Sequence, residues 1–275
     1  MKVACLVRPD PPLIYFANRI HAAHGVALAI VETGAPPPRQ ASKRSLRQRI
    51  GQSVLSLAAT IEGRQSRRAS TDLSRFFGDR WRHLDPGIPL LETSDINSGE
   101  VRRRLAELAP DVIVDHGTSL VSEEIASSAP VALNLHWGLS PYYRGVCCTE
   151  WALINRDPLN IGVTIHKLDR TVDGGDILAQ RRASIEPTDS AYSINMKLTA
   201  LGTDLMIAAL GRLKSGRPLH FATQDIALGA VRRIADWSPA LAAEIRRIEE
   251  EGLIAKMLAR PSRRTSLPII EMPAD

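Results

Sequence analysis

The sequence has few aromatic residues, few cysteines and no long apolar run. Aromatic residues make up 4% of its 275 residues, against 44% hydrophobic and 24% charged residues in all. No uninterrupted apolar stretch reaches the length of a transmembrane helix, which argues against a membrane-spanning protein. In "MKVACLVRPDPP" the apolar stretch ends at Arg8, Pro9 and Asp10, so it predicts a first strand rather than a signal peptide.

The three cysteines are Cys5, Cys147 and Cys148. An odd number cannot pair completely, and none of them has the spacing of a metal site. These features exclude a disulfide-stapled secreted scaffold and favour a reducing compartment. We therefore expect a soluble, cytoplasmic protein.

The net charge of +5 is concentrated in one stretch. Residues 39–82 contain eleven Lys and Arg residues, among them Arg64, Arg67 and Arg68, against three carboxylates. Such a stretch could meet phosphate groups, nucleic acid or an anionic membrane surface, or it could be a solvated surface insertion.

Short apolar runs alternate with helical patterns along the chain. Strands are expected at 3–7, 26–31, 88–92, 111–117, 131–136, 161–169 and 176–186. Helices are expected between the first two strands and at 94–110, 122–128, 148–156 and 188–216. Alternation of this kind predicts an α/β fold, with a Rossmann-like, mostly parallel twisted sheet flanked by helices. The 161–186 hairpin would add an antiparallel element.

Residues 1–216 are expected to form the main domain, with a basic helical insertion at about 39–83. Residues 217–275 are expected to form a small helical C-terminal extension and tail. Two helices are expected in 224–260, the second beginning at "SPALAAEI" (238–245).

The stretch "VALNLHWGLSPYYRG" (131–145) contains an amide and an imidazole in what looks like a buried strand. Side chains alternate along a strand, so Asn134 and His136 face one side while Leu133 and Leu135 face the other. Burying an unpartnered amide and imidazole costs free energy. This pair must therefore have buried partners or line a cavity.

A carboxylate, Asp173, follows in "LDRTVDGGDIL", where two glycines allow a tight turn. An amide, an imidazole and a carboxylate that converge on one cleft suit acyl transfer to an amine. The first two can stabilise an oxyanion, and the third can orient the imidazole or take a proton. No serine or cysteine lies in a nucleophile elbow, so direct transfer is simpler than a covalent intermediate. Taken singly, each residue also fits a structural role.

A rival hypothesis is a metal site made by His116, His136, His166 and Asp173. These residues come from separate elements and lack the local spacing of H-E-x-x-H motifs. No metal is therefore expected.

Two blocks, "LNLHWGLSPYYRG" and "GVTIHKLDRTVDGGDILAQ", resemble the folate-dependent formyltransferase family. That family includes glycinamide ribonucleotide, methionyl-tRNA and sugar N-formyltransferases. The resemblance covers roughly residues 88 to 210. Trp137 and Gly138 depart from it, because many members have proline and serine after the histidine.

The resemblance implies that Asn134, His136 and Asp173 are catalytic and that N10-formyltetrahydrofolate is the formyl donor. It also places a histidine, as in the glycinamide branch, at His166. The residues implied to bind the donor are Asp115, His116, Gly117, Thr118, Leu120, Val121, Leu168, Asp169 and Val172. The residues expected near the acceptor are Trp137, Tyr142, Tyr143 and Arg144.

The function implied is formyl transfer to a primary amine. The acceptor expected is an amino sugar carried on a nucleotide, because no tRNA-binding domain is recognisable. Alternatives are formylation of an amino acid or peptide precursor, a formyl-folate hydrolase, and a non-catalytic folate-binding or interaction protein. No nucleic-acid partner is expected, peripheral contact with an anionic surface is compatible with the basic stretch, and a homodimer is compatible with the sequence.

Overall fold

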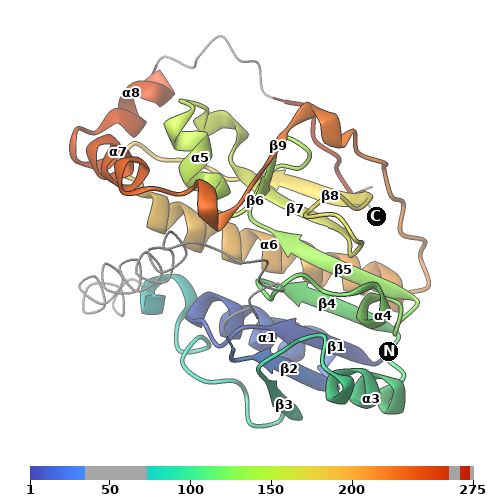
Figure 1. Cartoon of the computed structure of the whole chain (residues 1–275). Helices are drawn as coiled ribbons and strands as arrows, with labels where there is room; N and C mark the ends of the chain where they lie inside the picture. Colours follow the sequence, from blue (N-terminus) through green and yellow to red (C-terminus); the bar gives the residue numbers. More distant parts are fainter. Residues whose placement is uncertain (35–72, 260–266, 273–275) are drawn as a thin grey trace, which may run out of the picture.

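The structure is a computed structural model that describes residues 1–34, 73–259 and 267–272. Within these residues the chain forms a seven-stranded sheet with the order β3-β2-β1-β4-β5-β7-β8. The strands are β1 (Val3–Val7), β2 (Leu28–Glu32), β3 (Leu90–Thr93), β4 (Val112–His116), β5 (Val131–His136), β7 (Gly162–Lys167) and β8 (Ile177–Arg182). In Figure 1 they stack from β3 at the bottom to β8 at the top.

The strands from β3 to β5 are parallel, whereas β7 is antiparallel to both β5 and β8. The expected Rossmann-like α/β fold is therefore confirmed, and the predicted hairpin supplies its antiparallel part. Strands β1, β2 and β4 are buried along their whole length, as strands covered on both faces must be.

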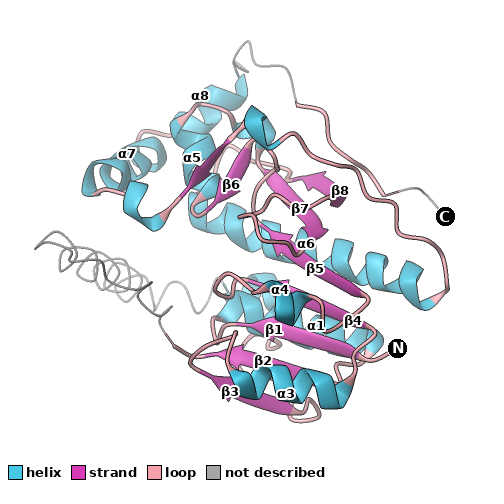
Figure 2. Cartoon of the chain, turned by 45° about the vertical axis from the view of Figure 1, so that its right-hand side comes forward, coloured by secondary structure: helices cyan, strands magenta, loops and turns pink. Residues whose placement is uncertain are grey.

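Helices cover both faces of this sheet (Figures 1 and 2). They are α1 (Pro11–His24), α3 (Gly99–Leu108), α4 (Glu123–Ala126), α5 (Cys148–Ile154), α6 (Ala191–Lys214), α7 (Pro239–Glu250) and α8 (Leu253–Ala259). On one face Phe16 of α1 and Leu205 of α6 join the larger apolar cluster. On the other face Leu105 of α3 and Ile125 of α4 form a second cluster. None of the described helices could span a lipid bilayer, judged by length and hydropathy.

The helix expected to begin at residue 94 begins at Gly99 instead. The side chain of Ser98 accepts a hydrogen bond from the backbone N–H of Val101, which caps the helix at that point.

Residues 217–237 contain no α-helix, so the helix predicted before Ser238 is wrong. The chain is extended there and forms β9 (Ala230–Arg232), with 3-10 turns at Ile226–Leu228 and Ile234–Asp236. Strand β9 pairs in parallel with β6 (Tyr143–Gly145), in a stretch that was expected to be a loop. Backbone pairing with a distant segment has replaced local helical bonding, which sequence periodicity does not reveal.

The helix expected from Ser238 is α7, and the Ser238 side chain caps it through the N–H of Leu241. Ile245, Ile248 and Ile254 extend the larger apolar cluster. The 3-10 turn Pro158–Asn160 contacts α8. The division of the chain at residue 216 into a catalytic domain and an extension stays a prediction.

The described end of the basic stretch, residues 73–77, is helical. Phe77 stacks on Tyr15 of α1 with ring centroids 4.3 Å apart, and Met196 of α6 joins their cluster. Residues 39–72 of the stretch lie outside the described residues, and so does the predicted contact of Arg64, Arg67 and Arg68 with a partner.

Candidate active site

Polar side chains form two adjacent rows across strands β4, β5, β7 and β8. The first row consists of Asp115, Asn134 and His166, which are register partners on neighbouring strands. The second row consists of His136, Thr164 and Gln180. All of these residues are buried. Cross-strand partners share a face, so the rows lie on the face covered by α3 and α4.

Asp173, in the loop between β7 and β8, lies against both rows. Its Oδ1 is 3.4 Å from Asn134 Nδ2 and 3.5 Å from His166 Nε2. Its Oδ2 is 3.5 Å from His136 Nδ1. The structure thus brings together Asn134, His136 and Asp173, and adds His166 to them.

The backbone around Asp173 explains the two glycines that follow it. Asp173 has a left-handed φ of 49°. A Cβ on Gly174 would lie 2.2 Å from Thr171 Oγ1, and one on Gly175 would lie 2.1 Å from the Lys167 carbonyl oxygen. Only glycine lets this loop fold back over the sheet and carry the carboxylate to His136.

A second segment secures the same carboxylate. The backbone N–H of Gly145 in β6 donates to Asp173 Oδ2 at 2.7 Å. Gly145 has a φ of +91°, and a Cβ there would lie 1.9 Å from the carbonyl oxygen of Arg232 in β9. The β6–β9 pair therefore depends on glycine at this position.

Two acceptors flank the His136 ring. Nε2 lies 2.9 Å from the Tyr143 carbonyl oxygen, and Nδ1 faces Asp173. A neutral ring can donate to only one of them. Burial lowers the pKa of His136, and the Asp173 carboxylate opposes that shift. A proton that enters the site is therefore stabilised most between His136 Nδ1 and the Asp173 carboxylate.

The contacts of His166 determine which N–H of Asn134 is free to bind a ligand. His166 Nδ1 lies 2.7 Å from the Lys167 carbonyl oxygen, which can only accept, so Nδ1 carries a proton. In the neutral ring Nε2 then accepts from Asn134 Nδ2 at 3.0 Å. The second N–H of Asn134 faces Asp173 across the longer 3.4 Å contact. This N–H can therefore most easily leave Asp173 and donate a hydrogen bond to a ligand oxygen instead.

The pKa values of the two carboxylic acids beside Asn134, Asp115 and Asp173, are shifted in opposite directions. Burial raises the pKa of Asp115 to about 7, although Thr118 donates to it at 2.6 Å. Burial also disfavours charge on Asp173, but His136, His166 and the Gly145 amide hold its pKa below the ordinary value. Environments that separate two carboxyl pKa values in this way are typical of acid–base sites.

The second row holds the loop that follows β5. Thr164 Oγ1 donates to the Gly138 carbonyl oxygen at 2.6 Å, and Gln180 Nε2 donates to the Ser140 carbonyl oxygen at 2.7 Å. Gln180 also pairs with the C-terminal tail, since its backbone N–H donates to the Ile270 carbonyl oxygen at 2.6 Å. We did not predict Thr164 or Gln180. The period-2 alternation of "VTIHK" places Thr164 on the face of His166 and could have revealed it.

Arg144 and Tyr143 lie at the site, but their polar groups are engaged within the protein. The Arg144 guanidinium donates to the carbonyl oxygens of Val172, Ile226 and Gly229 at 3.4, 2.9 and 3.4 Å. The Tyr143 hydroxyl donates to Asp157 Oδ2 at 2.8 Å. Both residues are buried, so the structure gives them a role in holding the loops together. Tyr142 is half-buried against the larger apolar cluster.

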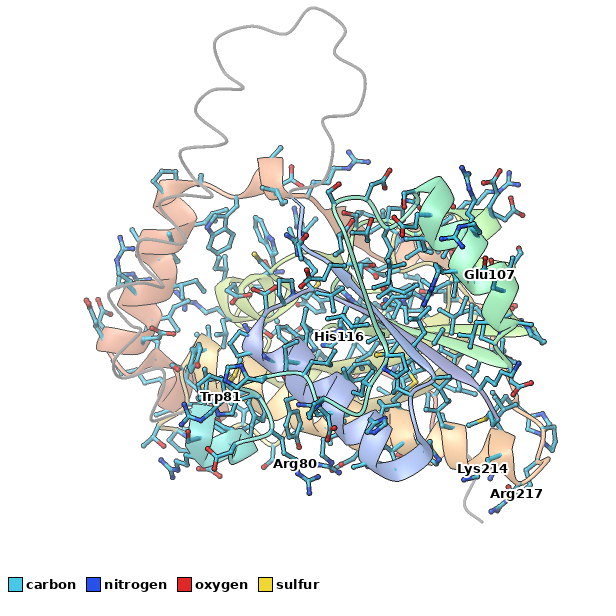
Figure 3. All side chains as sticks on the ribbon, turned by 90° about the horizontal axis from the view of Figure 1, so that it is seen from below. Arg80, Trp81, Glu107, His116, Lys214 and Arg217 are labelled. Carbon is cyan, nitrogen blue, oxygen red and sulfur yellow. The ribbon has the colours of Figure 1, made fainter. Side chains whose placement is uncertain are left out.

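His116 and Trp137 lie on the opposite face of the sheet from Asn134 and His136. His116 is buried inside the molecule (Figure 3), with its ring centroid 5.3 Å from Phe16 and 5.2 Å from Trp137. Its Nδ1 lies 2.8 Å from the Leu135 carbonyl oxygen, and burial lowers its pKa to about 3. The structure does not bring this pair to the polar rows.

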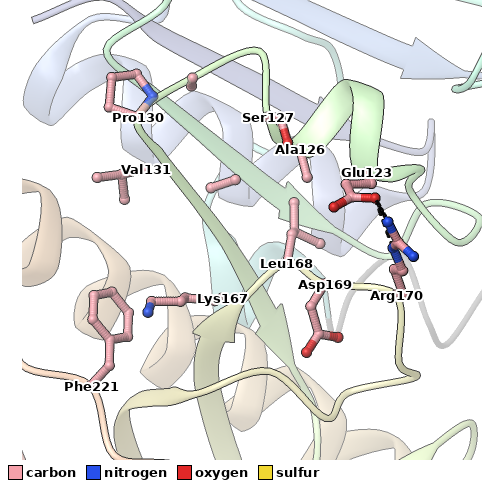
Figure 4. Close-up of a pocket in the computed structure, with 12 residues that line it drawn as sticks. Glu123, Ala126, Ser127, Pro130, Val131, Lys167, Leu168, Asp169, Arg170 and Phe221 are labelled. Atoms are coloured by element: carbon pink, nitrogen blue, oxygen red, sulfur yellow. Dashed lines mark hydrogen bonds and ion pairs between the residues drawn. The ribbon is translucent and has the colours of Figure 1, made fainter.

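A pocket of about 320 Å³ lies beside the first residues of β5 (Figure 4). Ala132, which precedes Asn134 by two residues on the same face of β5, lines it together with Leu168 and Asp169. An ion pair between Arg170 and Glu123 closes one side. Of the predicted donor-binding residues, Leu168 and Asp169 lie in this pocket.

The other predicted donor-binding residues lie near the ends of β4 and of the Asp173 loop. Gly117 has a φ of +76°, and Thr118 bonds to Asp115. Val121 is buried, whereas Leu120 and Val172 are 44% and 37% exposed. The two exposed apolar side chains are open to a ligand.

Two further residues that we did not predict touch the site. Cys148 Sγ lies 3.6 Å from His136 Nε2, and burial raises its pKa well above the usual value, so the thiol is not ionised. Gln224 Nε2 donates to the Asp173 carbonyl oxygen at 3.1 Å. Among the residues that the structure describes, no group of three or more His, Cys, Asp or Glu side chains is arranged to hold a metal ion.

Residues 26–210 match the model of the formyl transferase family. The chain belongs to this family. The match begins well before the 88–210 range that the two motif blocks suggest. It ends before β9, α7 and α8.

Solved structures of formyltransferases share the fold. A phosphoribosylglycinamide formyltransferase from Bacillus halodurans is 22% identical, with a TM-score of 0.51 over 78% of this chain and 96% of that one. A formyltransferase from Anoxybacillus kamchatkensis, in complex with UDP-4,6-dideoxy-4-formamido-L-AltNAc and tetrahydrofolate, is 16% identical, with a TM-score of 0.52 over 94% of this chain and 100% of that one. An N-formyltransferase from Helicobacter canadensis, in complex with folinic acid and dTDP-3-aminofucose, is 15% identical, with a TM-score of 0.54 over 86% of this chain and 73% of that one.

Proposed function

We propose that this formyltransferase moves a formyl group from N10-formyltetrahydrofolate to the amine of a nucleotide-linked amino sugar. The observation that carries the proposal is the convergence of Asn134, His136 and Asp173. A pocket lined by Ala132, on the same face of β5 as Asn134, supports it. The structures from Anoxybacillus and Helicobacter, which hold a folate and a nucleotide sugar, support the choice of donor and acceptor.

The pocket suits the ring of the donor. Its volume of about 320 Å³ is of the size that small-molecule sites have, and Ala132, Leu168 and Phe221 supply apolar walls. A ring bound there would lie along β5 from Asn134, which would put the formyl group near the Asn134 amide.

The chain's own groups then divide the work. As the acceptor amine attacks, the Asn134 N–H that faces Asp173 can turn to the developing negative charge on the formyl oxygen, and a protonated His136 can add a second donor. Asp173, held as a carboxylate by His136 and by the Gly145 amide, can take the proton that the amine must lose. As the bond between the formyl carbon and N10 then breaks, the protonated His136 can give its proton to N10, so that tetrahydrofolate leaves as a neutral amine. The nearby Cys148 thiol is not ionised and is therefore a poor nucleophile, so the amine attacks the formyl group directly, without a covalent enzyme intermediate.

The full chain should be incubated with N10-formyltetrahydrofolate and a panel of amines while tetrahydrofolate release is followed. The panel contains UDP- and dTDP-linked amino sugars, free amino sugars and amino acids. We expect release with a nucleotide-linked amino sugar. Release with amino acids alone would replace the acceptor, and release with none of the amines would reject the function.

The catalytic roles are tested by Asn134→Ala, His136→Ala and Asp173→Ala. Each should lower kcat by at least about a hundredfold, the usual loss for an oxyanion donor or an acid–base group. Asp176→Ala, at a half-exposed carboxylate of the same loop that pairs with Lys167, is the matched control and should stay close to wild type. A folded variant of the three with near wild-type turnover would remove its residue from the mechanism.

A further inference from the structure

Strand β9 places an arginine beside the catalytic carboxylate. Arg232 is the register partner of Gly145, and its carbonyl oxygen accepts from the N–H of Val146 at 2.9 Å. The same Gly145 donates its N–H to Asp173. Because the close contact of β6 and β9 allows no side chain at Gly145, the backbone of Arg232 has a fixed place next to the site.

The side chain of Arg232 rests on an aromatic surface. Its guanidinium carbon lies 4.2 Å from the ring centroid of Trp151, and Trp151 in turn meets Trp237 edge to face, with centroids 6.1 Å apart. Trp151 is buried, whereas Arg232 and Trp237 are half-buried. Stacking on an indole orients a guanidinium while leaving its N–H edge available for an anion.

Arg232 differs in this respect from Arg144, its neighbour on β6. Arg144 is buried and donates to three backbone carbonyl oxygens. Within the described part of the chain, no carboxylate forms an ion pair with Arg232. Arg232 is thus the cation of this strand pair that can meet a ligand.

The charge of Arg232 acts on Cys148, which lies next to the His136 ring. Burial raises the pKa of the Cys148 thiol, and among the charges around it Arg232 acts in the opposite direction. Cys148 Sγ lies 3.6 Å from His136 Nε2. The donor pocket lies toward the other end of β5, at Ala132, so a ligand held by Arg232 would approach His136 and Asp173 from the opposite side.

We infer that Arg232, supported by Trp151, binds the phosphate group of the acceptor. The inference rests on the proposed function and narrows its acceptor to a nucleoside diphosphate derivative. A guanidinium fork matches phosphate oxygens in bidentate fashion, and the half-buried Trp237 ring beside it offers a surface on which a nucleobase can stack. The arginine lies beyond residue 210, outside the part of the chain that matches the family.

The kinetic test pairs Arg232→Gln with two acceptors, the nucleotide-linked amino sugar and the same amino sugar without phosphates. With the nucleotide-linked acceptor, Arg232→Gln should raise KM about ten- to a hundredfold, the range of a lost charge-assisted contact, with kcat and the KM for the donor little changed. With the free amino sugar, wild type and variant should be equal. Arg246→Gln, which removes the same charge from the exposed surface of α7, is the control and should change neither KM.

The inference would be overturned if Arg232→Gln raised the KM equally for both acceptors, or if it left the KM for the nucleotide-linked acceptor unchanged. Arg232→Lys keeps the charge over Trp151 but not the fork, so it should show a smaller increase in KM than Arg232→Gln. It also provides the comparison if the glutamine variant has a lowered melting temperature.

Calorimetric titration with UDP separates this inference from the proposed function, because it needs no turnover. UDP should bind wild type and Arg246→Gln alike, and Arg232→Gln at least about tenfold more weakly. Equal binding to Arg232→Gln refutes the phosphate site even if formyl transfer is observed. Arg232-dependent UDP binding without any formyl transfer supports the phosphate site and rejects the proposed reaction.

Discussion

The two halves of the sheet differ in what their buried positions contain. The parallel strands β1, β2 and β4 are almost entirely apolar on both faces, with polar side chains only at their carboxyl ends. Strands β5, β7 and β8 instead place buried polar side chains next to each other in two rows. The strands β1, β2 and β4, here called the parallel half, thus contribute mainly apolar side chains, whereas β5 and the antiparallel pair β7 and β8 hold most of the polar groups that the proposed chemistry needs.

The largest effect should follow from emptying the core of the parallel half. Phe16 of α1 is fully buried over these strands, so Phe16→Ala should lower the free energy of unfolding by about 3–5 kcal/mol. Urea denaturation measures this loss. Activity per folded molecule should stay near wild type, because Phe16 does not touch the polar rows.

Phe76→Ala is the matched control for the Phe16 variant. Phe76 is only half-buried, so the same substitution should cost clearly less. Equal losses at the two positions, or a folded Phe16→Ala protein with much reduced kcat, would contradict the division of tasks between the two halves.

Asp115 marks the boundary between the halves, and its burial makes stability depend on pH. Its pKa is about 7 in the folded protein, because burial, together with nearby Glu32 and Asp173, outweighs the hydrogen bond from Thr118 and the effect of the nearby His166 ring. An unfolded aspartate has a pKa of about 3.9, so the folded state keeps a proton that the unfolded state releases, and stability falls as pH rises between these values. Asp115→Asn removes this loss.

The stability that Asp115→Asn gains over wild type should therefore be greater at pH 8.5 than at pH 5.5 by about 2 kcal/mol. Urea denaturation of both proteins at the two pH values measures the difference. Asp79→Asn, at an exposed surface carboxylate, should show no such difference. A gain that is independent of pH would show that Asp115 is charged in the folded protein at both pH values.

The smallest effect should come from the support of the loop after β5. Gln180→Leu keeps the size of the side chain but removes the hydrogen bonds to Ser140 and Thr164, so kcat should fall about tenfold while both KM values change little. Steady-state kinetics, with each substrate varied in turn, measures the split. Arg181→Leu, at the exposed neighbouring position, should have no comparable effect. A rise in either KM at unchanged kcat would show that Gln180 does not position the catalytic groups.

Much of the fold could be predicted because its signals are local. Apolar runs marked the seven strands of the sheet to within a few residues, and Ser98, Ser190 and Ser238 cap helices at or near the expected starts. The alternation of Asn134 and His136, and the glycines after Asp173, correctly indicated side chains that meet. The roles of those side chains in catalysis stay predictions.

Other features depend on contacts between segments far apart in the sequence. Nothing local in "GAVRR" shows that β9 pairs with β6, or that Gln180 links the loop after β5 to Ile270. Arg144 was expected near the acceptor, but three carbonyl oxygens from the Asp173 loop and residues 226–229 engage it. Such partners are known only when the chain has folded.

The sequence by itself determined the alternation of strands and helices, the polar residues at the end of β5 and the glycine turn that carries Asp173, because hydrophobic periodicity and backbone freedom are properties of short segments. Tertiary structure decided which polar groups meet. Register aligned Asp115, Asn134 and His166 across three strands. Burial raised the pKa of Asp115, whereas His136, His166 and the Gly145 amide lowered the pKa of Asp173. The pairing of β9 with β6 set Arg232 beside the site. Desolvation and charge–charge interactions depend on distance in space, which no local pattern of residues specifies.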